Sequence, residues 1–478
     1  MLALAPLDQD AAPLDQGERF ALDLLIDLSG VLRMDVAPTP EVVRLRITGA
    51  REGTTREVRT LFDDDLFVVR DGEVALPRWT LALVRDVAGG VAEQRSGARD
   101  RHGRVPSSEN VLVQDGSSLE RVPVVSRAAG SLAAAVARAA GRRPAFAIAP
   151  WPGGRRWAAA LTHDLDVVDW WPAFTALRLA ELAGKRELRQ ALSVTVAALS
   201  SVARDVVGDG VRGVLDAESA FDVRSSWFIL CGDPTLASAR AGDLTYRPDG
   251  TRARRILREL VDAGHEIGLH GSFATSEKPA LFATQRARLA SLTATPVDGV
   301  RQHYLRTRPS TTPAAMSASG FRFDSTCGFA DRNGFRLGVA DVLPTWDASN
   351  DVALPIDEAP FCWMDRALSK YRGVERPDAW IDDALALADS CRSVDGLFAG
   401  IWHPNLTPAL GFPGAPAAYA RLVAELVSRD AYVAPLGELV TWRRARRAVR
   451  AMGITADGQV ALSGDTSGLR IERLAGGA

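Results

Sequence analysis

Two periodicities of apolar and polar positions alternate along the chain from residue 157 onward. Short apolar runs, such as WAAAL at 157–161 and LFAGIW at 397–402, have the length and composition of buried strands. Between them lie longer segments such as TRARRILRELVDAG (251–264), in which apolar residues recur three and four positions apart and a glycine ends the run. Strands separated by helices of this length predict parallel βα units, and seven or eight of them favour a closed barrel.

The remaining segments show other patterns, which divide the chain into regions. Strand-like runs and one helix-like segment between residues 21 and 150 predict a small α+β domain, and the Pro/Gly-rich stretch PWPGGRRW marks its end. The fold class we expect is α/β, with a distorted (β/α) TIM-like barrel after that domain. The expected regions are a flexible lead-in at 1–20, the α+β domain at 21–150, the barrel at 155–445 with a helical insertion at 171–222, and a tail at 446–478 with a β-hairpin over 459–474.

Composition narrows the classes of protein that fit this pattern. Of 478 residues, 57 are Lys or Arg and 59 are Asp or Glu, and the net charge of −2 argues against nucleic acid as a partner. Four widely spaced cysteines without a CxxC pair indicate neither a disulfide framework nor a zinc ribbon. The chain begins without the basic and apolar regions of a signal peptide and has no apolar run of membrane-spanning length, so we expect a cytoplasmic protein without a membrane span.

The first apolar strand ends in an unusual group of polar residues, Thr-His-Asp-Leu-Asp. Because side chains alternate in a strand, Thr162, Asp164 and Asp166 share one face while His163 takes the other. Two carboxylates on one buried face repel each other, so a metal, another cation or a shared proton must offset the repulsion. If one aspartate binds a divalent metal, the other is available as a general base. The alternative is that Asp166 caps the following helix.

Other polar residues also lie where strands of the predicted barrel end. His270 ends the strand HEIGLHGS and is a candidate metal ligand, although a lone histidine is often a core residue. Arg301 and His303 share a face in GVRQHYL. Arg301 can orient a base aspartate, whereas His303 is a ligand, a substrate donor or core filling. His403, in GIWHPN, can protonate a leaving group or be structural.

Taken in order, these motifs resemble the polysaccharide deacetylase family (NodB homology), metal-dependent carbohydrate esterases with a distorted (β/α) barrel. The Thr-His-Asp-Leu-Asp segment is similar to the first family motif, which implies that Asp164 is the catalytic base and Asp166 a metal ligand. GHEIGLHGS is similar to the second motif and implies that His270 is a ligand. The family's next histidine would fall at position 274, where this chain has Ala274.

The later motifs extend the resemblance. Arg-Gln-His-Tyr at 301–304 is similar to the third motif, which implies that Arg301 is the partner of the base and that His303 replaces the missing ligand, with Tyr304 beside the substrate. The segment 321–335 resembles the fourth motif and places Asp324 in the site. GIWHPN resembles the last motif and implies that His403 is the catalytic acid, with Trp402 suited to stacking on a sugar.

The resemblance implies a metal-dependent hydrolase that removes N- or O-acetyl groups from a carbohydrate or glycan precursor. The expected cofactor is a divalent metal, zinc in the first place. Two alternatives remain open: a hydrolase of another C–N bond on the same fold, and a non-catalytic carbohydrate-binding pseudoenzyme in which the loss of the histidine at position 274 reflects lost chemistry. The sequence leaves the sugar, the acyl group and the oligomeric state undetermined.

Overall fold

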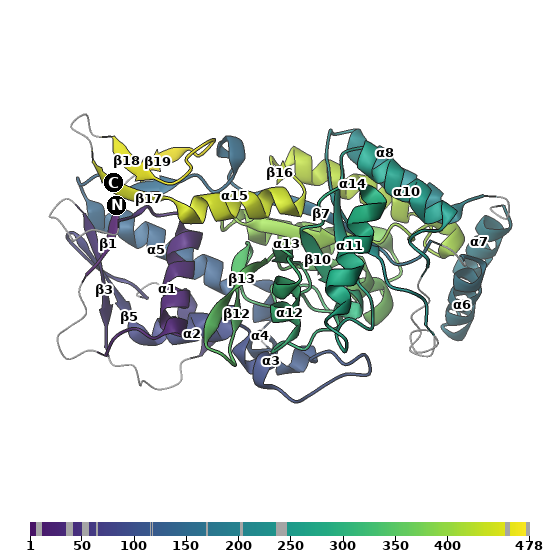
Figure 1. The fold of residues 1–478 in the computed structure, drawn as a ribbon, viewed down its shortest axis with the longest axis horizontal. Coiled ribbons are helices and arrows are strands. Elements are labelled where there is room, and N and C mark those ends of the chain that lie inside the picture. The colour runs from purple at the N-terminus through teal and green to yellow at the C-terminus, as the bar shows by residue number, and fades with distance from the viewer. Residues whose placement is uncertain are drawn as a thin grey trace.

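The chain forms an elongated molecule built around two β-sheets (Figure 1). The computed structural model describes residues 1–5, 12–34, 42–49, 57–63, 66–114, 116, 118–168, 171–200, 204–235, 246–454 and 459–474. A seven-stranded sheet lies at one end together with both chain termini, a ten-stranded sheet occupies the middle, and helices α6 and α7 lie at the other end. None of the described helices is long and apolar enough to cross a membrane.

The ten-stranded sheet carries the repeated βα units that the sequence predicts. Its strand order is β12–β13–β11–β10–β9–β8–β7–β15–β14, with β16 also paired to β7, and all its pairings are parallel except the one between β12 and β13. The sheet curls into a half-barrel with β12 and β14 at its edges, so the predicted α/β fold with a distorted barrel is confirmed. The strands are β7 (Ala158–Leu165), β8 (Ser226–Leu230), β9 (Glu266–Gly271), β10 (Gly299–Gln302), β11 (Phe323–Asp324), β12 (Leu343–Asp347), β13 (Val352–Glu358), β14 (Trp363–Met364), β15 (Leu397–Ile401) and β16 (Tyr432–Val433).

Alternation along these strands creates two separate apolar layers. In β8, Phe228 points into the cluster on the concave face, whereas Trp227 and Ile229 point to the layer beneath the outer helices. Both faces of the strands are therefore buried, as is usual for a parallel sheet covered by helices. The helices that follow the strands are α10 (Thr251–Asp262), α11 (Leu281–Thr293), α12 (Thr312–Ala318), α13 (Pro377–Arg392), α14 (Ala415–Ser428) and α15 (Leu436–Ala448).

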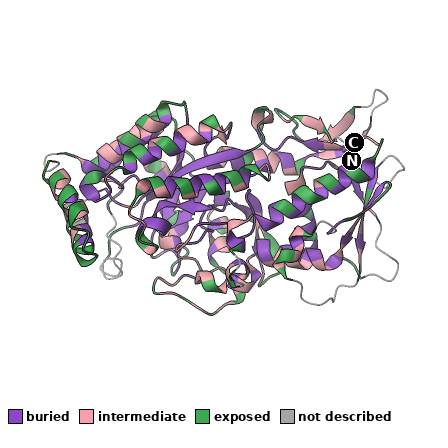
Figure 2. Cartoon of the chain, turned by 180° about the vertical axis from the view of Figure 1, so that it is seen from behind, coloured by how far each residue is buried: buried purple, intermediate pink, exposed green. Residues whose placement is uncertain are grey.

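The long segment between β7 and β8 consists of helices. Helix α8 (Val206–Ser219) buries apolar residues against the barrel, while α6 (Trp171–Gly184) and α7 (Leu188–Leu199) form the far end of the molecule. Figure 2 shows α7 mostly exposed, and Leu188, Leu192 and Leu199 on this helix are 66–71% exposed. Beyond α8, this insertion adds little to the barrel core.

The N-terminal residues form the second sheet, with strand order β18–β17–β2–β1–β3–β5–β4. Its central strands β2, β1, β3 and β5 are parallel, and antiparallel pairs occur only at the two edges. The elements are β1 (Leu2–Leu4), β2 (Arg33–Met34), β3 (Val43–Thr48), β4 (Val68–Arg70), β5 (Glu73–Pro77) and β6 (Phe146–Ile148), with helices α1 (Gln16–Ser29), α2 (Arg78–Ala88), α3 (Val91–Arg95), α4 (Val111–Gln114) and α5 (Val124–Ala140).

The expectation of a flexible lead-in over residues 1–20 is wrong for the residues described there. Strand β1 lies in the middle of the sheet, between β2 and β3, because Met1 and Leu2 are apolar and only 1% exposed. Helix α1 begins after Asp15, whose side chain accepts the backbone N–H of Glu18 while Glu18 accepts that of Asp15. This capping box was a readable start signal for a helix.

The C-terminal tail completes the N-terminal sheet. Strand β17 (Arg450–Ile454) pairs with β2 and with β18 (Val460–Ser463), whereas β19 (Ile471–Arg473) pairs with β6. The hairpin expected over 459–474 is therefore wrong, because its two strands belong to different sheets.

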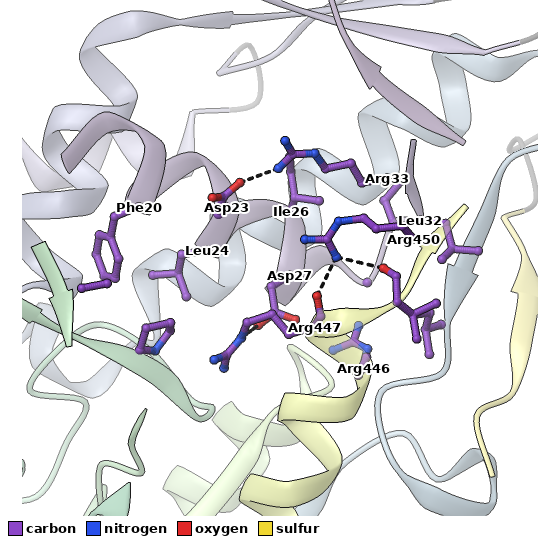
Figure 3. Close-up of a pocket in the computed structure, with 16 residues that line it drawn as sticks. Phe20, Asp23, Leu24, Ile26, Asp27, Leu32, Arg33, Arg446, Arg447 and Arg450 are labelled. Atoms are coloured by element: carbon purple, nitrogen blue, oxygen red, sulfur yellow. Dashed lines mark hydrogen bonds and ion pairs between the residues drawn. The ribbon is translucent and has the colours of Figure 1, made fainter. Parts of the chain in front are cut away.

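Ion pairs connect helix α15 of the barrel to the N-terminal domain (Figure 3). Arg447 contacts Asp27 of α1 at 3.1 Å and Asp357 of β13 at 2.8 Å. One turn earlier, the fully buried Arg443 lies 2.8 Å from Asp341 and 3.5 Å from Asp27. The two sheets are thus held in one arrangement by buried charge as well as by apolar contact.

Candidate active site

Strand β7 places its polar residues on opposite faces, as its alternation predicts. Asp164 points to the concave side at the carboxyl end of the strand and is 4% exposed. His163 points outward, where its ring contacts Glu218 at 2.9 Å and the carbonyl of Trp402 at 2.9 Å. The outward histidine is therefore held in a closed buried network, and only the inward carboxylates face the space above the sheet.

The carboxylate of Asp164 is paired with Arg301, which reaches it from β10. Arg301 Nη1 donates to Asp164 Oδ1 at 2.7 Å and to Thr162 Oγ1 at 3.0 Å, while its other nitrogens donate to Ser325. The guanidinium is 0% exposed and lies 4.2 Å over the ring of Phe228. Burial acts to raise the pKa of Asp164, but the positive charges of Arg301, His270 and His403 together outweigh it, so the pKa lies below the usual 3.8. Asp164 is accordingly ionised and fixed in orientation.

Three residues from the ends of β7, β9 and β10 converge beside this pair. Asp166, His270 and His303 each present one ligand atom, and these atoms lie within 4.8 Å of one another. His270 Nε2 is 3.3 Å and His303 Nδ1 is 3.4 Å from Asp166 Oδ1. His270 donates its Nδ1–H to the carbonyl of Arg301 at 2.9 Å, which directs the lone pair of Nε2 to the cluster.

This cluster fits a divalent metal. Oδ1 of Asp166 is a buried atom that accepts no hydrogen bond from the described part of the chain, although two imidazole nitrogens lie close to it. The nitrogen atoms His303 Nδ1 and His270 Nε2 are only 3.0 Å apart, so without a metal one can donate a hydrogen bond to the other, and with both unprotonated their lone pairs can bind one cation. A carboxylate with two imidazoles is a common set of protein ligands for a metal that keeps an open position.

The turn that carries His303 has an uncommon backbone. Residues His303–Leu305 form the short segment η5, in which Tyr304 and Leu305 have φ of +57° and +54°. Side chains disfavour this left-handed region by about 1 kcal/mol or more per residue. The turn directs His303 toward His270 and lays the ring of Tyr304 beside it, with 4.3 Å between ring centroids. Strain at this position favours a functional role for the turn.

A third histidine approaches the cluster from the end of β15. His403 Nδ1 donates to Asp365 Oδ1 at 2.7 Å, and its backbone N–H donates to Asp365 Oδ2 at 2.6 Å. The other ring nitrogen, Nε2, lies 3.6 Å from Asp166 Oδ2. Burial acts to lower the pKa of His403, but the charge and hydrogen bond of Asp365 prevail and raise it above 6.5. His403 is therefore suited to hold a proton near neutral pH.

These groups line one cavity with a volume of about 210 Å³ above the carboxyl ends of the strands. The predicted residues Asp164, Asp166, His270, His303, Tyr304 and His403 all line it, and Arg301 lies directly behind Asp164. The other lining residues are Arg104, Val167, Gln302, Leu305, Met364, Arg366, Lys370, Tyr371 and Asn405.

The structure places two predicted residues outside this cavity. Asp324 is 2% exposed and accepts hydrogen bonds from Thr326, because alternation in β11 sends Phe323 and Ser325 inward and Asp324 outward. It lines a different pocket, next to Glu358. The prediction that Asp324 binds substrate is thus contradicted by its position.

Trp402 also points away from the cavity. It follows β15 directly before His403, so the two side chains take opposite faces. The indole is 3% exposed and packs among Trp363, Trp380 and Tyr419 beneath the outer helices. Its position contradicts the prediction that Trp402 stacks on a sugar.

Asp365, the partner of His403, was not among the residues predicted from the sequence. A signal was present, because Asp365 directly follows the short buried strand Trp363–Met364 and thus resembles the other polar residues at strand ends. The basic residues of the cavity wall, Arg104, Arg366 and Lys370, were not predicted either, and Arg104 comes from the N-terminal domain. No local pattern indicates that a residue 60 positions before Asp164 reaches the same cavity.

The comparisons with known proteins found similar solved structures but no similar sequence. No protein-family model matches the chain, and no curated protein is significantly similar to it in sequence. Among solved structures, a candidate polysaccharide deacetylase from Mycobacterium smegmatis is 20% identical with a TM-score of 0.42, and the match covers 62% of this chain and 93% of that one. A candidate polysaccharide deacetylase from Pseudomonas aeruginosa PAO1 is 17% identical with a TM-score of 0.40, covering 62% and 94%.

A CE4-family pseudoenzyme from Bacillus anthracis is also similar in structure. It is 11% identical with a TM-score of 0.29, and the match covers 59% of this chain and 65% of the pseudoenzyme. The structures that the chain resembles are therefore polysaccharide deacetylases, and they include a protein described as a pseudoenzyme.

Proposed function

We propose that the protein is a metal-dependent hydrolase that removes N- or O-acetyl groups from a carbohydrate or glycan precursor. The observation that carries this proposal is the convergence in one cavity of Asp166, His270 and His303 with an aspartate whose pKa is lowered and a histidine whose pKa is raised. Acyl hydrolysis needs a base for the attacking water and an acid for the leaving group. The lowered pKa of Asp164 suits the base, and the raised pKa of His403 suits the acid.

Asp166, His270 and His303 would hold the metal, with zinc the first candidate for a ligand set of one carboxylate and two imidazoles. When bound, a divalent metal supplies Lewis acidity that polarises an acyl carbonyl. The family resemblance places a histidine ligand at position 274, where this chain has Ala274. In this assignment His303 takes the place of that ligand. The neighbouring Asp164 remains outside the ligand set because Arg301 binds its Oδ1.

Asp164 takes the role of general base. Arg301 fixes Oδ1, and Oδ2 is directed toward the cluster, 3.8 Å from His270 Nε2. A water molecule next to this cluster lies within reach of that oxygen and can give up its proton to it. Arg301 stabilises the ionised carboxylate before the reaction and cannot itself be deprotonated.

His403 takes the role of general acid. Its Nδ1–H is held by Asp365, so the proton on Nε2 faces the cavity and can be donated to the departing amine or alcohol. The charge of Asp365 stabilises the imidazolium until the donation. Tyr304 offers the aromatic surface in this cavity on which a sugar ring can lie.

The metal content of the purified full chain tests the proposal. We expect about one equivalent of zinc or another divalent ion in the wild type and in an Asp233→Ala control, an exposed aspartate outside the cavity. Asp166→Ala, His270→Ala and His303→Ala should each bind the metal at least about tenfold more weakly, because each loses a direct ligand. Release of acetate from acetylated sugars then tests turnover.

The outcomes separate the alternatives. If His303→Ala alone retained full affinity, the third ligand would be another residue. A wild-type protein that binds no metal even after zinc is added would overturn the proposed hydrolase and favour the pseudoenzyme, which Ala274 suggests. Metal binding with intact Asp164 and His403 but activity only on another amide would support the alternative hydrolase.

A further inference from the structure

One wall of the cavity is basic and has no role in the chemistry described above. Arg104, Arg366 and Lys370 line it together with Tyr304 and Tyr371. Lys370 lies within the short π-helical segment η6 (Ala367–Tyr371), and Arg366 directly precedes this segment and follows Asp365. Such π-helical turns are rare and often mark functional sites.

Two of these cations form no ion pair and no hydrogen bond with a carboxylate among the described residues, although the charges of Asp365 and Asp166 act on them from a greater distance. Arg366 contacts the ring of Phe412, 5.3 Å from its centroid, and donates no hydrogen bond within the described structure. Lys370 lies 5.9 Å from the ring centroid of Tyr304 and 5.7 Å from that of Tyr371, again without a carboxylate. By contrast, the buried structural arginine Arg78 is bound by Glu18 through two hydrogen bonds of 2.7 Å. A structural explanation therefore fits Arg366 and Lys370 poorly.

The third cation comes from the N-terminal domain. Arg104 is 8% exposed and is positioned by Asp100, whose Oδ2 accepts its Nε–H at 2.7 Å. Its Nη1 reaches Tyr371 Oη at 3.1 Å and the carbonyl of Tyr304 at 3.4 Å. The segment before helix α4 thus closes over the barrel and contributes a guanidinium to the cavity.

Neither carboxylate that lines the cavity forms an ion pair with Arg366 or Lys370. The lining carboxylates are Asp164 and Asp166, which are already engaged by Arg301 and by the histidine cluster. The pKa of Lys370 is lowered to about 8. The largest cause is partial loss of hydration next to the cavity, and the positive charges of Arg366 and other arginines add to it, although part of the side chain still reaches solvent. Repulsion of this kind is relieved when an anion binds between the cations.

We propose that the cavity selects a carbohydrate that carries an anionic substituent, a phosphate or a carboxylate, and that Arg366, Lys370 and Arg104 bind this group. The proposal deepens the proposed hydrolase, since it names the substrate class of the same cavity. Guanidinium groups bind phosphate or carboxylate through paired hydrogen bonds, and a lysine adds a mobile positive charge. The anionic group then sets the distance between the acyl group and Asp164.

Equilibrium binding by calorimetry tests this selection without requiring turnover. The probes are N-acetylglucosamine as the neutral sugar, N-acetylglucosamine 1-phosphate for phosphate, and N-acetylmuramic acid for carboxylate. We expect the wild type to bind one anionic sugar at least about tenfold more tightly than the neutral one, as charge-assisted hydrogen bonds allow. Arg366→Gln and Lys370→Gln should each reduce that preference several-fold, whereas Arg189→Gln and Lys278→Gln on the exposed surface should not.

The charged probe that binds more tightly identifies the source of the negative charge. Equal binding of all three sugars by the wild type would overturn the proposal. An unchanged preference in Lys370→Gln together with Arg366→Gln would overturn it as well. Since Lys370 is exposed, its substitution should not impair folding, and this variant keeps the test valid if Arg366→Gln proves unstable.

A further arm separates this proposal from the proposed function. His270→Ala removes a metal ligand but leaves the basic wall intact, so we expect it to keep the preference for the anionic sugar. Loss of that preference in His270→Ala would show that the anion binds a metal and would overturn the role of the wall. If the wild type bound no metal but still preferred the anionic sugar, the hydrolase would fail while the anion site would stand.

Discussion

The two ring nitrogens of His403 have different surroundings, and this difference defines its role. Nδ1 is bound by Asp365, which is 0% exposed, whereas Nε2 faces the cavity. The two carboxylate oxygens of Asp164 differ in the same way, because Oδ1 is bound by Arg301 while Oδ2 lies on the side of the histidine cluster. Each of the two residues is thus oriented by a buried partner of opposite charge, as the proposed base and acid require.

At this scale we predict the effect of Asp365→Asn. The raised pKa of His403 results from Asp365 outweighing burial, so removing the negative charge lowers that pKa. A general acid must be protonated, so its contribution is lost as pH rises through its pKa. The alkaline limb of kcat should therefore move to lower pH, with kcat at pH 8 falling about tenfold or more.

The pH profile of acetate release measures this shift, and His403→Ala gives the rate without any general acid. A lower kcat with an unmoved alkaline limb would contradict the prediction, because it would mean that Asp365 supports the fold without tuning His403. The NMR titration of the His403 ring in both proteins provides the same comparison without turnover.

Individual strands decide which side chains reach the cavity. Alternation in β7, β10 and β15 sends Asp164, Arg301 and His403 to the concave face, and the same rule sends Asp324 and Trp402 away from it. The resemblance to family motifs supplied the order of these residues. The period of two in each short strand determined which of them line the cavity.

At this scale we predict that Asp324→Asn leaves hydrolysis within about threefold of the wild type but changes the pH dependence of stability. Burial raises the pKa of Asp324 to about 6, against 3.8 ordinarily, so the folded protein keeps a proton that the unfolded chain releases between about pH 4 and 6. The free energy of unfolding must then fall as pH rises through this window. Asparagine does not titrate, so the variant should lose less stability there.

Urea denaturation at pH 4.5 and 7.5 tests this linkage. A shift of about 2 pKa units at about 1.4 kcal/mol each sets an upper limit of about 3 kcal/mol on the advantage of the variant at pH 7.5. Parallel stability curves for the two proteins, or a loss of activity in the variant, would contradict the outward position of Asp324.

The whole molecule joins distant parts of the chain around the cavity. The C-terminal strand β17 extends the N-terminal sheet through β2, while the N-terminal Arg104 reaches the barrel cavity. Helix α15 connects the two parts through the pairs that Arg443 and Arg447 form with Asp27. The N-terminal domain is therefore a structural part of the site rather than an appended module.

For the whole molecule we predict that a chain ending at Val449 is destabilised. The truncation removes β17, β18 and β19, leaves the edges of β2 and β6 unpaired, and uncovers the apolar cluster around Met1 and Ile148. We expect the apparent melting temperature to fall by roughly 5 °C or more, since each kcal/mol corresponds to about 2–4 °C for chains of 150–250 residues.

Differential scanning calorimetry of the full chain and the truncated chain measures the effect. Met452→Ala is the control, because this side chain of β17 is 58% exposed and its loss should leave the melting temperature unchanged. An unaltered melting temperature in the truncated chain would mean that the tail adds nothing to the N-terminal sheet.

The sequence by itself determined the repeated βα units, the concave position of Asp164 and Asp166, and the candidate ligands His270 and His303. These features follow from local periodicity, since the period of two in strands and of about 3.6 in helices is written in neighbouring residues. The capping box of α1, formed by Asp15 and Glu18, is also a local sequence pattern and could have been predicted.

Only the tertiary structure decided the partners that lie far apart in the chain. Asp365 meets His403 across 38 residues, Arg104 meets Tyr371 across 267, and β17 joins β2 from the opposite end of the chain. Such contacts depend on which sheet edge or cavity is free after the local elements have packed, and no periodicity encodes that choice. Periodicity brings His403, Asp164 and the cluster of Asp166, His270 and His303 to one face, and long-range packing supplies their partners and the basic wall.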